Sequence, residues 1–313
     1  MKLPHITTKQ EEILKLLYKY RFLNRIQIQV LLGHKDKRRV IAWLHDLRQK
    51  QYVEWIYSTD FTDKSKPAIY YISINGVRFL KTLENDAGTE YLYLPEEVRK
   101  RYKEKDRSKS FIDRSLLVAD CCLTLEVVNK SCGDNNKPNN NSTSSNPTNS
   151  DGEAKTNTNV HYTYVTESDY IDPDHGYHFL AEHETLRPNL CIVKTERKNN
   201  RKTTSNYLLE IFDSTLPDYR LRYRLKAYVK YLVEGDWEAE TEDSNPPTIL
   251  LVYPRLADLI NAKRRTRKLL LDEYYEAEDI PKNVHIRFTT TEQLQQHGIT
   301  GPIWEEKRRL YGV

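Results

Sequence analysis

Apolar residues recur at helical spacing in three successive segments of the N-terminal third. The first segment can be capped by Thr7 or Thr8 and carries an apolar stripe that ends at Tyr20. The second follows Asn24 and stops at Gly33, and the third covers 36–51. In the third segment, apolar residues such as Val40, Leu44 and Leu47 would lie on one side of a helix. The three segments together predict three short amphipathic helices.

Two short runs rich in aromatic and β-branched residues follow these helices. They cover 52–57 and 68–74, and a polar stretch separates them. A further helix is predicted over 75–83. Three helices, a two-stranded hairpin and a closing helix are the element order of a winged helix-turn-helix, in which the third helix enters the major groove and the hairpin forms the wing.

Basic side chains gather on the third predicted helix and at the tip of the hairpin. The candidate DNA-binding residues are Lys35, Lys37, Arg38, Arg39, Arg48, Lys64 and Lys66. Guanidinium groups suit guanine edges and phosphate oxygens, so Arg38 and Arg39 are the first candidates for contacts to DNA. The alternatives are a solvated basic face and a winged helix that binds protein.

The net charge of +4 conceals a difference between the two parts of the chain. Residues 1–110 hold 23 Lys and Arg against 14 Asp and Glu, a balance of +9, and 111–313 hold 26 against 31, a balance of −5. A positive field attracts polyanions and makes their binding depend on salt. This asymmetry supports double-stranded DNA as the partner of the N-terminal part.

Strand-like and helical patterns alternate in the second half of the chain. Predicted strands cover 160–165, 189–195, 206–212, 247–254 and 284–290, and 177–183 is a further strand or a turn beside one. Helices are predicted over about 110–129, 219–234 and 255–276. Such alternation is typical of an α/β layered domain. Together the two halves predict an α+β or α/β chain.

A segment rich in Asn, Ser, Thr and Pro interrupts this second half at about 131–159. It has few apolar side chains with which to offset its ordering entropy, so it is expected to be a disordered insertion, the alternative being a linker between domains. The predicted organisation is a DNA-binding domain over 1–93, a charged helical connector over 94–110 and an α/β domain over 111–313 that contains the insertion.

Several classes of function lack their sequence signals. The chain has no Walker A phosphate loop, no GxGxxG motif and no HExxH helix, and its four cysteines lack zinc-ligand spacing and are expected to be reduced. No apolar run is long enough to span a membrane, and the N-terminus does not resemble a secretory signal. A cytoplasmic protein without a membrane partner is therefore expected.

The chain resembles the plasmid replication-relaxation protein family, which includes relaxases that act in plasmid mobilisation. The resemblance begins in TKQEEILKLLYKYRFLNRIQIQVLLG, WLHDLRQKQYVEW and YYISINGVRFL. It continues in LRPN, LLEIFDST, LKAYVKY, ILLVYP, VHIRFTT and GPIW. These motifs occur in the family's order and cover nearly the whole chain outside the insertion.

The resemblance implies that the second domain is related to the restriction-endonuclease fold. In that fold an Asp and a Glu on neighbouring strands hold a divalent metal, and a Lys two residues after the Glu positions the attacking water. This chain departs from the pattern at two positions. Asn189 stands where the family commonly has Asp, and Phe212 stands where the polar group is expected.

Glu210 retains the second carboxylate of that pattern and is the candidate metal ligand. Glu182 or Glu184 could complete a carboxylate pair with it, and Lys226 could reach the site from the following helix. If the site is active, the candidate catalytic residues are Glu184, Glu210 and Lys226, and the cofactor is Mg²⁺. In the competing interpretation, Glu210 is a leftover polar residue in a non-catalytic fold, and no cofactor is expected.

These observations predict a double-stranded DNA-binding protein of plasmid or mobile-element replication, relaxation or mobilisation, whose nuclease-like domain is degenerate. One alternative is an active metal-dependent DNA nickase or relaxase. Another is a transcriptional or copy-number regulator with a dimerising C-terminal domain. Plasmid replication or transfer proteins and a second copy of the chain are further candidate partners.

Overall fold

The structure, a computed structural model, describes residues 4–57, 66–83, 101, 104–134, 159–170, 180, 186–198, 201–241, 245–274 and 283–306. Its N-terminal elements are α1 (Thr8–Tyr20), β1 (Leu23–Asn24), α2 (Arg25–Leu31), α3 (Lys37–Gln49), β2 (Val53–Ile56), β3 (Ile69–Ile72) and α4 (Ile74–Thr82). The three strands form an antiparallel sheet in the order β1-β3-β2. The helices, the hairpin and the closing helix predicted from the sequence are present in the predicted order.

Side-chain caps fix where the first helices begin. The side chains of Thr7 and Asn24 each accept a hydrogen bond from a backbone N–H of the first turn. The side-chain oxygens of Gln10 and Gln27 in turn accept from the backbone N–H groups of these two cap residues. These are two capping boxes, and they satisfy N–H groups that a helix start leaves unpaired. Thr7, rather than Thr8, is the cap of α1. Gly33 has φ +61°, the left-handed conformation that its position after α2 suggested.

The second part of the chain is built around a six-stranded sheet in the order β4-β5-β6-β7-β8-β9. The strands are β4 (Asn159–Thr166), β5 (Leu190–Lys198), β6 (Arg201–Ile211), β7 (Thr248–Tyr253), β8 (Ile286–Thr290) and β9 (Glu305–Glu306). Pairing is antiparallel from β4 to β6, parallel from β6 to β8, and antiparallel between β8 and β9. The carboxyl ends of β6, β7 and β8 therefore meet at one edge of the sheet.

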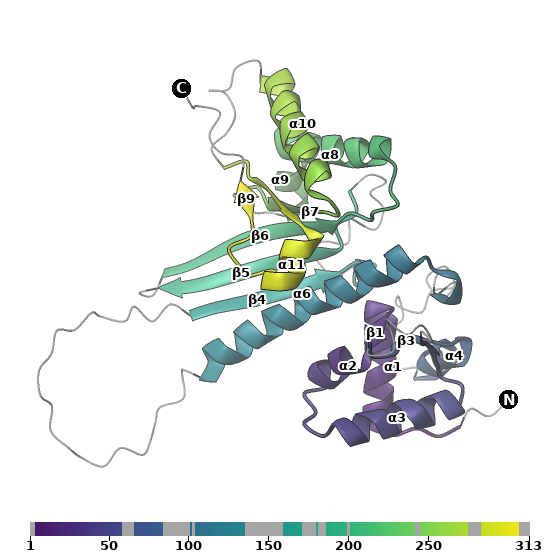
Figure 1. Ribbon diagram of the computed structural model, residues 1–313. Helices are drawn as coiled ribbons and strands as arrows, with labels where there is room; N and C mark the ends of the chain where they lie inside the picture. The colour runs from purple at the N-terminus through teal and green to yellow at the C-terminus, as the bar shows by residue number, and fades with distance from the viewer. Residues whose placement is uncertain are drawn as a thin grey trace, which may run out of the picture.

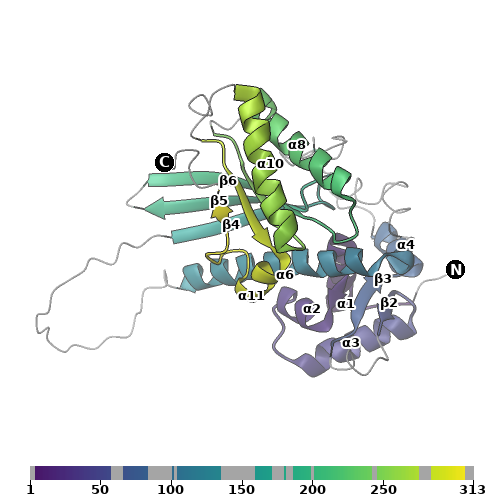
Figure 2. The same cartoon turned by 45° about the horizontal axis from the view of Figure 1, so that its top comes forward.

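Helices cover both faces of this sheet (Figures 1 and 2). The helical elements of this part are the 3-10 turn η2 (Glu104–Asp106), α6 (Lys109–Asp134), α8 (Asp218–Glu234), α9 (Asp236–Thr241), α10 (Leu256–Tyr274) and α11 (Thr291–His297). The long helix α6 lies between the sheet and the N-terminal helices, whereas α8 and α10 pack on the opposite face. Successive side chains along β6 point to opposite faces of the sheet. Leu209 and Ile211 enter the core on the α6 side, whereas Leu208 and Phe212, the residue that follows β6, enter the core on the α8–α10 side.

Polar contacts connect the N-terminal helices to α6 and to the sheet. The buried Gln27 amide donates to the Leu116 carbonyl at 2.9 Å and to the Asp120 carboxylate at 2.7 Å. Arg21 donates to Glu104 at 2.7 Å. One apolar core is continuous from α1 through α6 to β5, β6 and β7. The position of the N-terminal helices is thus set by packing as well as by the chain connection.

The α+β architecture expected from the sequence is confirmed, and the differences lie at the ends of elements. Helix α6 continues to Asp134, past the predicted start of the insertion at 131, and the rest of the insertion lies outside the described residues. Most of the predicted connector and of the strand at 177–183 also lies outside them. The predicted domain limits stay a prediction. Among the described residues, none of the helices combines the length and apolar character of a membrane span.

Four elements were not expected from the sequence: β1, α9, α11 and β9. Each is 7 residues or shorter, and such short elements carry little periodicity of their own. Strands β5 and β6 are also longer than expected, since they run into the polar connection as far as Lys198 and Arg201. Backbone pairing extends this hairpin without apolar side chains. Hydrophobic patterning alone therefore ends β5 too early and starts β6 too late.

Candidate functional site

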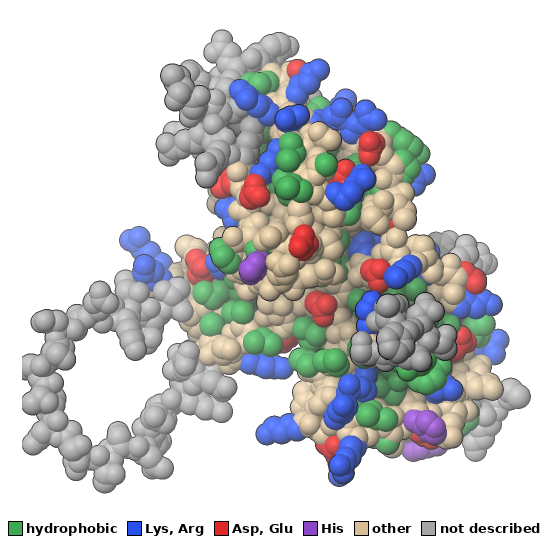
Figure 3. Space-filling view, viewed as in Figure 1, with side chains coloured by type: hydrophobic (Ala, Val, Ile, Leu, Met, Phe, Trp, Pro, Cys, Tyr) green, Lys and Arg blue, Asp and Glu red, His purple; other side chains and the backbone are tan. Residues whose placement is uncertain are grey.

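Helix α3 presents opposite faces to the core and to solvent. Val40, Leu44 and Leu47 are buried against the other N-terminal elements. The first turn carries Lys37, Arg38 and Arg39, and all three are exposed, as is Lys35 just before the helix. Figure 1 shows α3 along one edge of the molecule, and Figure 3 shows Lys and Arg side chains at that edge. The sequence prediction of a basic, outward-facing start of the third helix is therefore consistent with the structure.

The cations of this surface are not neutralised within the described part of the chain. Asp36 caps α3 by accepting from the Arg38 backbone N–H at 2.8 Å, and its carboxylate lies 3.8 Å from the Arg39 guanidinium. That contact joins exposed groups and contributes little. Within the described ranges, Lys35, Lys37 and Arg38 have no carboxylate at ion-pair distance. Their charge, together with the helix N-terminus, makes the start of α3 attractive to an anion.

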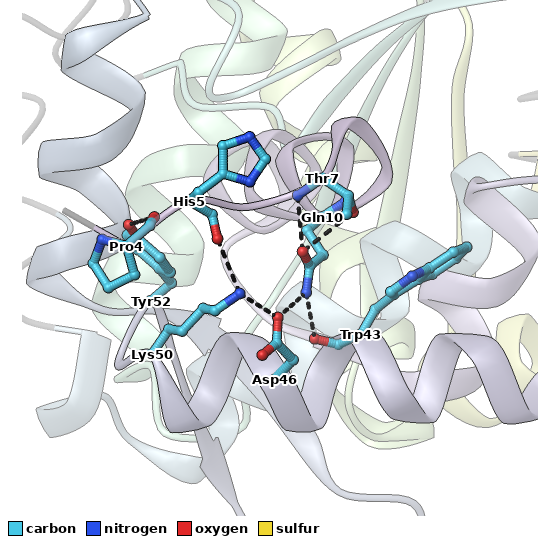
Figure 4. Close-up of polar contacts among 8 residues, drawn as sticks. All are labelled: Pro4, His5, Thr7, Gln10, Trp43, Asp46, Lys50 and Tyr52. Carbon is cyan, nitrogen blue, oxygen red and sulfur yellow. Dashed lines mark hydrogen bonds and ion pairs between the residues drawn. The ribbon is translucent and has the colours of Figure 1, made fainter.

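A polar network holds α3 against the start of the chain (Figure 4). The side-chain amide of Gln10, on α1, is 1% exposed and donates to the Asp46 carboxylate at 2.6 Å. Lys50 donates to the same carboxylate at 2.7 Å and to the His5 carbonyl at 2.9 Å. The hydrogen bond from Lys50, followed by that from Gln10, lowers the pKa of Asp46. The network therefore fixes the axis of α3 relative to α1.

The remaining predicted DNA-binding residues lie near the hairpin. The Arg48 guanidinium, at the end of α3, lies 3.8 Å from the centre of the Trp55 ring on β2, which is a cation–π contact. Arg48 therefore connects α3 to the hairpin while its side chain stays exposed. Lys66 is exposed just before β3, whereas Lys64 lies outside the described residues.

Glu210, near the end of β6, is a fully buried carboxylate that the sequence analysis selected. Its side chain is 0% exposed and forms an ion pair with the guanidinium of Arg224 on α8. Tyr228 lies one helical turn after Arg224 and is also 0% exposed. Residues four apart share one face of a helix, so α8 places an arginine and a tyrosine together over this carboxylate.

Burial dominates the ionisation of Glu210. Removal from water raises the pKa of this carboxyl to about 7, although Arg224, Tyr228 and the more distant Arg114 each act to lower it. A carboxyl with such a pKa exchanges its proton near neutral pH. The group is therefore able to change charge without leaving the core.

Asn189 and Phe212 have structural roles at the positions where the family pattern differs. The Asn189 backbone N–H donates to the Leu209 carbonyl at 2.7 Å, and its side-chain oxygen accepts from the Ile211 N–H at 2.8 Å. These two bonds extend the pairing of β5 and β6 by one residue before the start of β5. Phe212 is 2% exposed and packs on Tyr253, with 4.8 Å between ring centroids.

The other predicted catalytic residues do not gather at Glu210 within the part of the chain that is described. Lys226 is exposed on α8, and Arg224 takes the place beside the carboxylate that the sequence analysis considered for Lys226. Glu182 and Glu184 lie outside the described residues. The described residues contain no group of three or more His, Cys, Asp or Glu side chains able to hold a metal ion.

Among the described residues, the donor set around Glu210 does not fit a divalent cation. Magnesium needs several oxygen ligands, and here one carboxylate is paired with a guanidinium while the Asn189 oxygen is engaged by a backbone N–H. The sequence analysis missed Arg224. The signal that could have revealed it was the spacing of Arg224 and Tyr228 on the buried side of the predicted helix over 219–234.

A family model described as replication-relaxation matches residues 14–245, which include the N-terminal helices, α6, β4 to β6 and α8. Neither the curated proteins nor the solved structures gave a match.

Proposed function

The chain belongs to the replication-relaxation family, and from this premise we propose that it binds double-stranded DNA of a plasmid or other mobile element through α3. Membership implies a role in the replication or relaxation of plasmid or mobile-element DNA. The proposal adds the contact: the N-terminal elements act as a winged helix-turn-helix, α3 enters the major groove and the β2–β3 hairpin lies beside it.

The observation that carries this proposal is the division of α3 into two faces. One face is buried in the core, and the hydrogen bonds among Gln10, Asp46 and Lys50 hold the helix in place. The opposite face is exposed and presents Lys37, Arg38 and Arg39 at the start of the helix. Ile41 continues that outer face and is 44% exposed, so an apolar group is available for a thymine methyl. Three adjacent exposed cations at the start of a helix suit contacts to phosphate oxygens and guanine edges.

For the second part of the chain we propose a nuclease-like domain without metal-dependent cleavage. Glu210 is paired with Arg224. Of the two residues that differ from the family pattern, Asn189 accepts a hydrogen bond from the backbone of β6, and Phe212 packs on Tyr253 in the core. Removing one charged ligand and the water-positioning group takes away contributions that are commonly worth several kcal/mol each in metal-assisted hydrolysis. In this proposal the domain supports DNA binding without catalysing strand scission.

Duplex binding can be tested with Arg38→Ala combined with Arg39→Ala. Loss of two phosphate contacts should weaken binding and flatten the log–log salt dependence by about 1.8, taking about 0.9 per contact on duplex DNA. The matched control is Lys198→Ala with Lys202→Ala, which removes the same charge from exposed positions on the β5–β6 hairpin. Fluorescence anisotropy with a labelled duplex gives both quantities. Equal behaviour of the two double variants would refute a specific role for α3.

A regulator of transcription or copy number would bind duplex DNA through the same helix. The two roles differ in the position of the bound site. Footprinting of the protein on its own replicon separates them: protection near a replication or transfer origin supports the proposed role, and protection confined to a promoter supports the regulator.

A further inference from the structure

A second basic surface lies on the opposite side of the large sheet from the N-terminal helices. It surrounds a cleft of about 440 Å³ between α8 and α10. Arg222 of α8 lines one side, and Arg264, Arg265 and Lys268 of α10 line the other. Figure 3 shows Lys and Arg side chains gathered over the end of the molecule that Figure 1 labels α8 and α10. We call this the α8–α10 cleft.

The positive charge of the α8–α10 cleft is not balanced by its own acidic residues. The acidic lining residues are Asp218 and Asp258, and Asp258 is held by Arg255 through bonds of 2.7 and 2.9 Å. In the described ranges, the four lining cations have no carboxylate at ion-pair distance. Cations that converge in excess of their counter-charges repel one another, so a bound polyanion would stabilise this arrangement.

The cleft also contains a buried polar group that lacks a partner. Tyr253, at the carboxyl end of β7, lines the cleft and is 1% exposed. Its hydroxyl has no hydrogen-bond partner among the described residues. A buried hydroxyl in this state is costly, and a ligand in the cleft could satisfy it.

Two exposed tyrosines lie on α8, the helix that forms one side of this cleft. Tyr219 and Tyr223 are 60% and 62% exposed, and their spacing of four residues places them on the same side of the helix. They do not line the cleft themselves, but each follows a lining residue, Asp218 or Arg222, in sequence. Large aromatic side chains that remain this exposed on a helix with a cationic groove are suited to stacking on bases.

We propose that the α8–α10 cleft binds single-stranded DNA, with phosphates on Arg222, Arg264, Arg265 and Lys268 and bases stacked on Tyr219 and Tyr223. The exposed tyrosines favour a single strand over a duplex, because the bases of a duplex are stacked on one another and offer no free faces to an aromatic ring. This site goes beyond the proposed duplex contact of α3 and uses different residues. A protein with both sites could hold a duplex and an adjacent unpaired strand.

The charge contribution is tested with the full-length triple variant Arg222→Gln, Arg264→Gln and Lys268→Gln, whose three positions are exposed. The probe is a fluorescein-labelled oligothymidylate of about 16 nucleotides, the upper site size of common single-strand binders. We expect the affinity to fall by tenfold or more and the salt slope to flatten by about 2, at about 0.7 per phosphate on single strands. The control variant Lys198→Gln, Arg201→Gln and Lys202→Gln removes the same charge from the β5–β6 hairpin and should bind like the unmodified protein.

The stacking contribution is tested with Tyr219→Ala combined with Tyr223→Ala. We expect the affinity for oligothymidylate to fall at least fivefold, since stacking on one base is worth about 1–3 kcal/mol. The pair Tyr219→Phe and Tyr223→Phe retains both rings and should retain the affinity. Unchanged affinity in the alanine pair would overturn the assignment to a single strand.

Duplex binding keeps this proposal separate from that for α3. The triple variant should bind a duplex of the same length as tightly as the unmodified protein, which also shows that it is folded. The Arg38→Ala, Arg39→Ala variant should lose duplex affinity and keep its affinity for oligothymidylate. Failure of the unmodified protein to bind oligothymidylate at low salt, or equal losses in the triple variant and its control, would overturn the α8–α10 site while leaving α3 untouched.

Discussion

The guanidinium of Arg224 on α8 forms an ion pair with the carboxylate of Glu210, which is buried at the end of β6. In the proposed nuclease-like domain, this pair supplies one positive charge at the carboxylate that would otherwise hold a divalent cation. It compensates only part of the desolvation of the carboxylate, because the pKa of Glu210 is still raised to about 7. Consequences for stability and for catalysis follow from this single contact.

The raised pKa predicts a stability that falls as the pH rises. Between about pH 4.5 and 7 the folded protein binds a proton at Glu210 that the unfolded chain has released, so ionisation of this group opposes folding. Relative to Glu210→Gln, the unmodified protein should lose about 3 kcal/mol of unfolding free energy between pH 5 and 8. Urea denaturation at several pH values measures this difference. Parallel pH dependences for the two proteins would mean that Arg224 keeps the pKa near its ordinary value.

The pairing of Glu210 also predicts that the purified protein does not cut DNA. Supercoiled plasmid incubated with the protein and Mg²⁺ or Mn²⁺ should remain supercoiled on an agarose gel, although the protein binds it. Nicking that disappears in Glu210→Ala would support the active nickase instead, and Lys226→Ala would then test the predicted role of that lysine.

Restoring the family pattern with Asn189→Asp is compatible with the fold, because a carboxylate can also accept from the Ile211 N–H. The companion change Phe212→Lys would bury an amine against Tyr253 and should cost stability.

The hydrogen bond between Gln10 and Asp46 predicts how the position of α3 can be disturbed. Gln10→Glu places a second carboxylate where the amide now donates to Asp46 at 2.6 Å, so like charges would meet. This variant should be less stable than Gln10→Ala at neutral pH, and its deficit should shrink as the pH falls and a carboxyl takes up a proton. Chemical denaturation at pH 4 to 7 measures the effect. A deficit that did not change with pH would show that the network has no electrostatic role.

The contact of Gln27 with α6 predicts coupling between the N-terminal helices and the rest of the molecule. Gln27→Ala removes the donors to the Leu116 carbonyl and to Asp120, and should reduce stability by about 1–3 kcal/mol. Hydrogen exchange should become faster in α2 and at the start of α6 and should stay unchanged in α8. Faster exchange confined to α2 would indicate that the N-terminal part unfolds independently.

The sequence by itself determined the elements with strong periodicity. Apolar spacing located α1, α2, α3, α8 and α10. Residue types that satisfy free N–H groups identified the cap Asn24 and narrowed the cap of α1 to Thr7 or Thr8, of which the structure shows Thr7. The exposed cations of α3 were also predictable, because the apolar stripe of Val40, Leu44 and Leu47 requires the opposite face to meet solvent. These properties depend on neighbours within one or two turns of a helix.

Tertiary structure decided which residues meet across elements. The spacing of Arg224 and Tyr228 shows that they share one side of α8, but the rotation of α8 against β6 decides that Arg224, rather than Lys226, covers Glu210. The α8–α10 cleft likewise lies between two helices that α9 and β7 separate in sequence. Its cations are therefore distant in sequence and become neighbours only when the helices pack. Local periodicity fixes which side of an element is buried, and the packing angle between elements fixes which buried and exposed groups become neighbours.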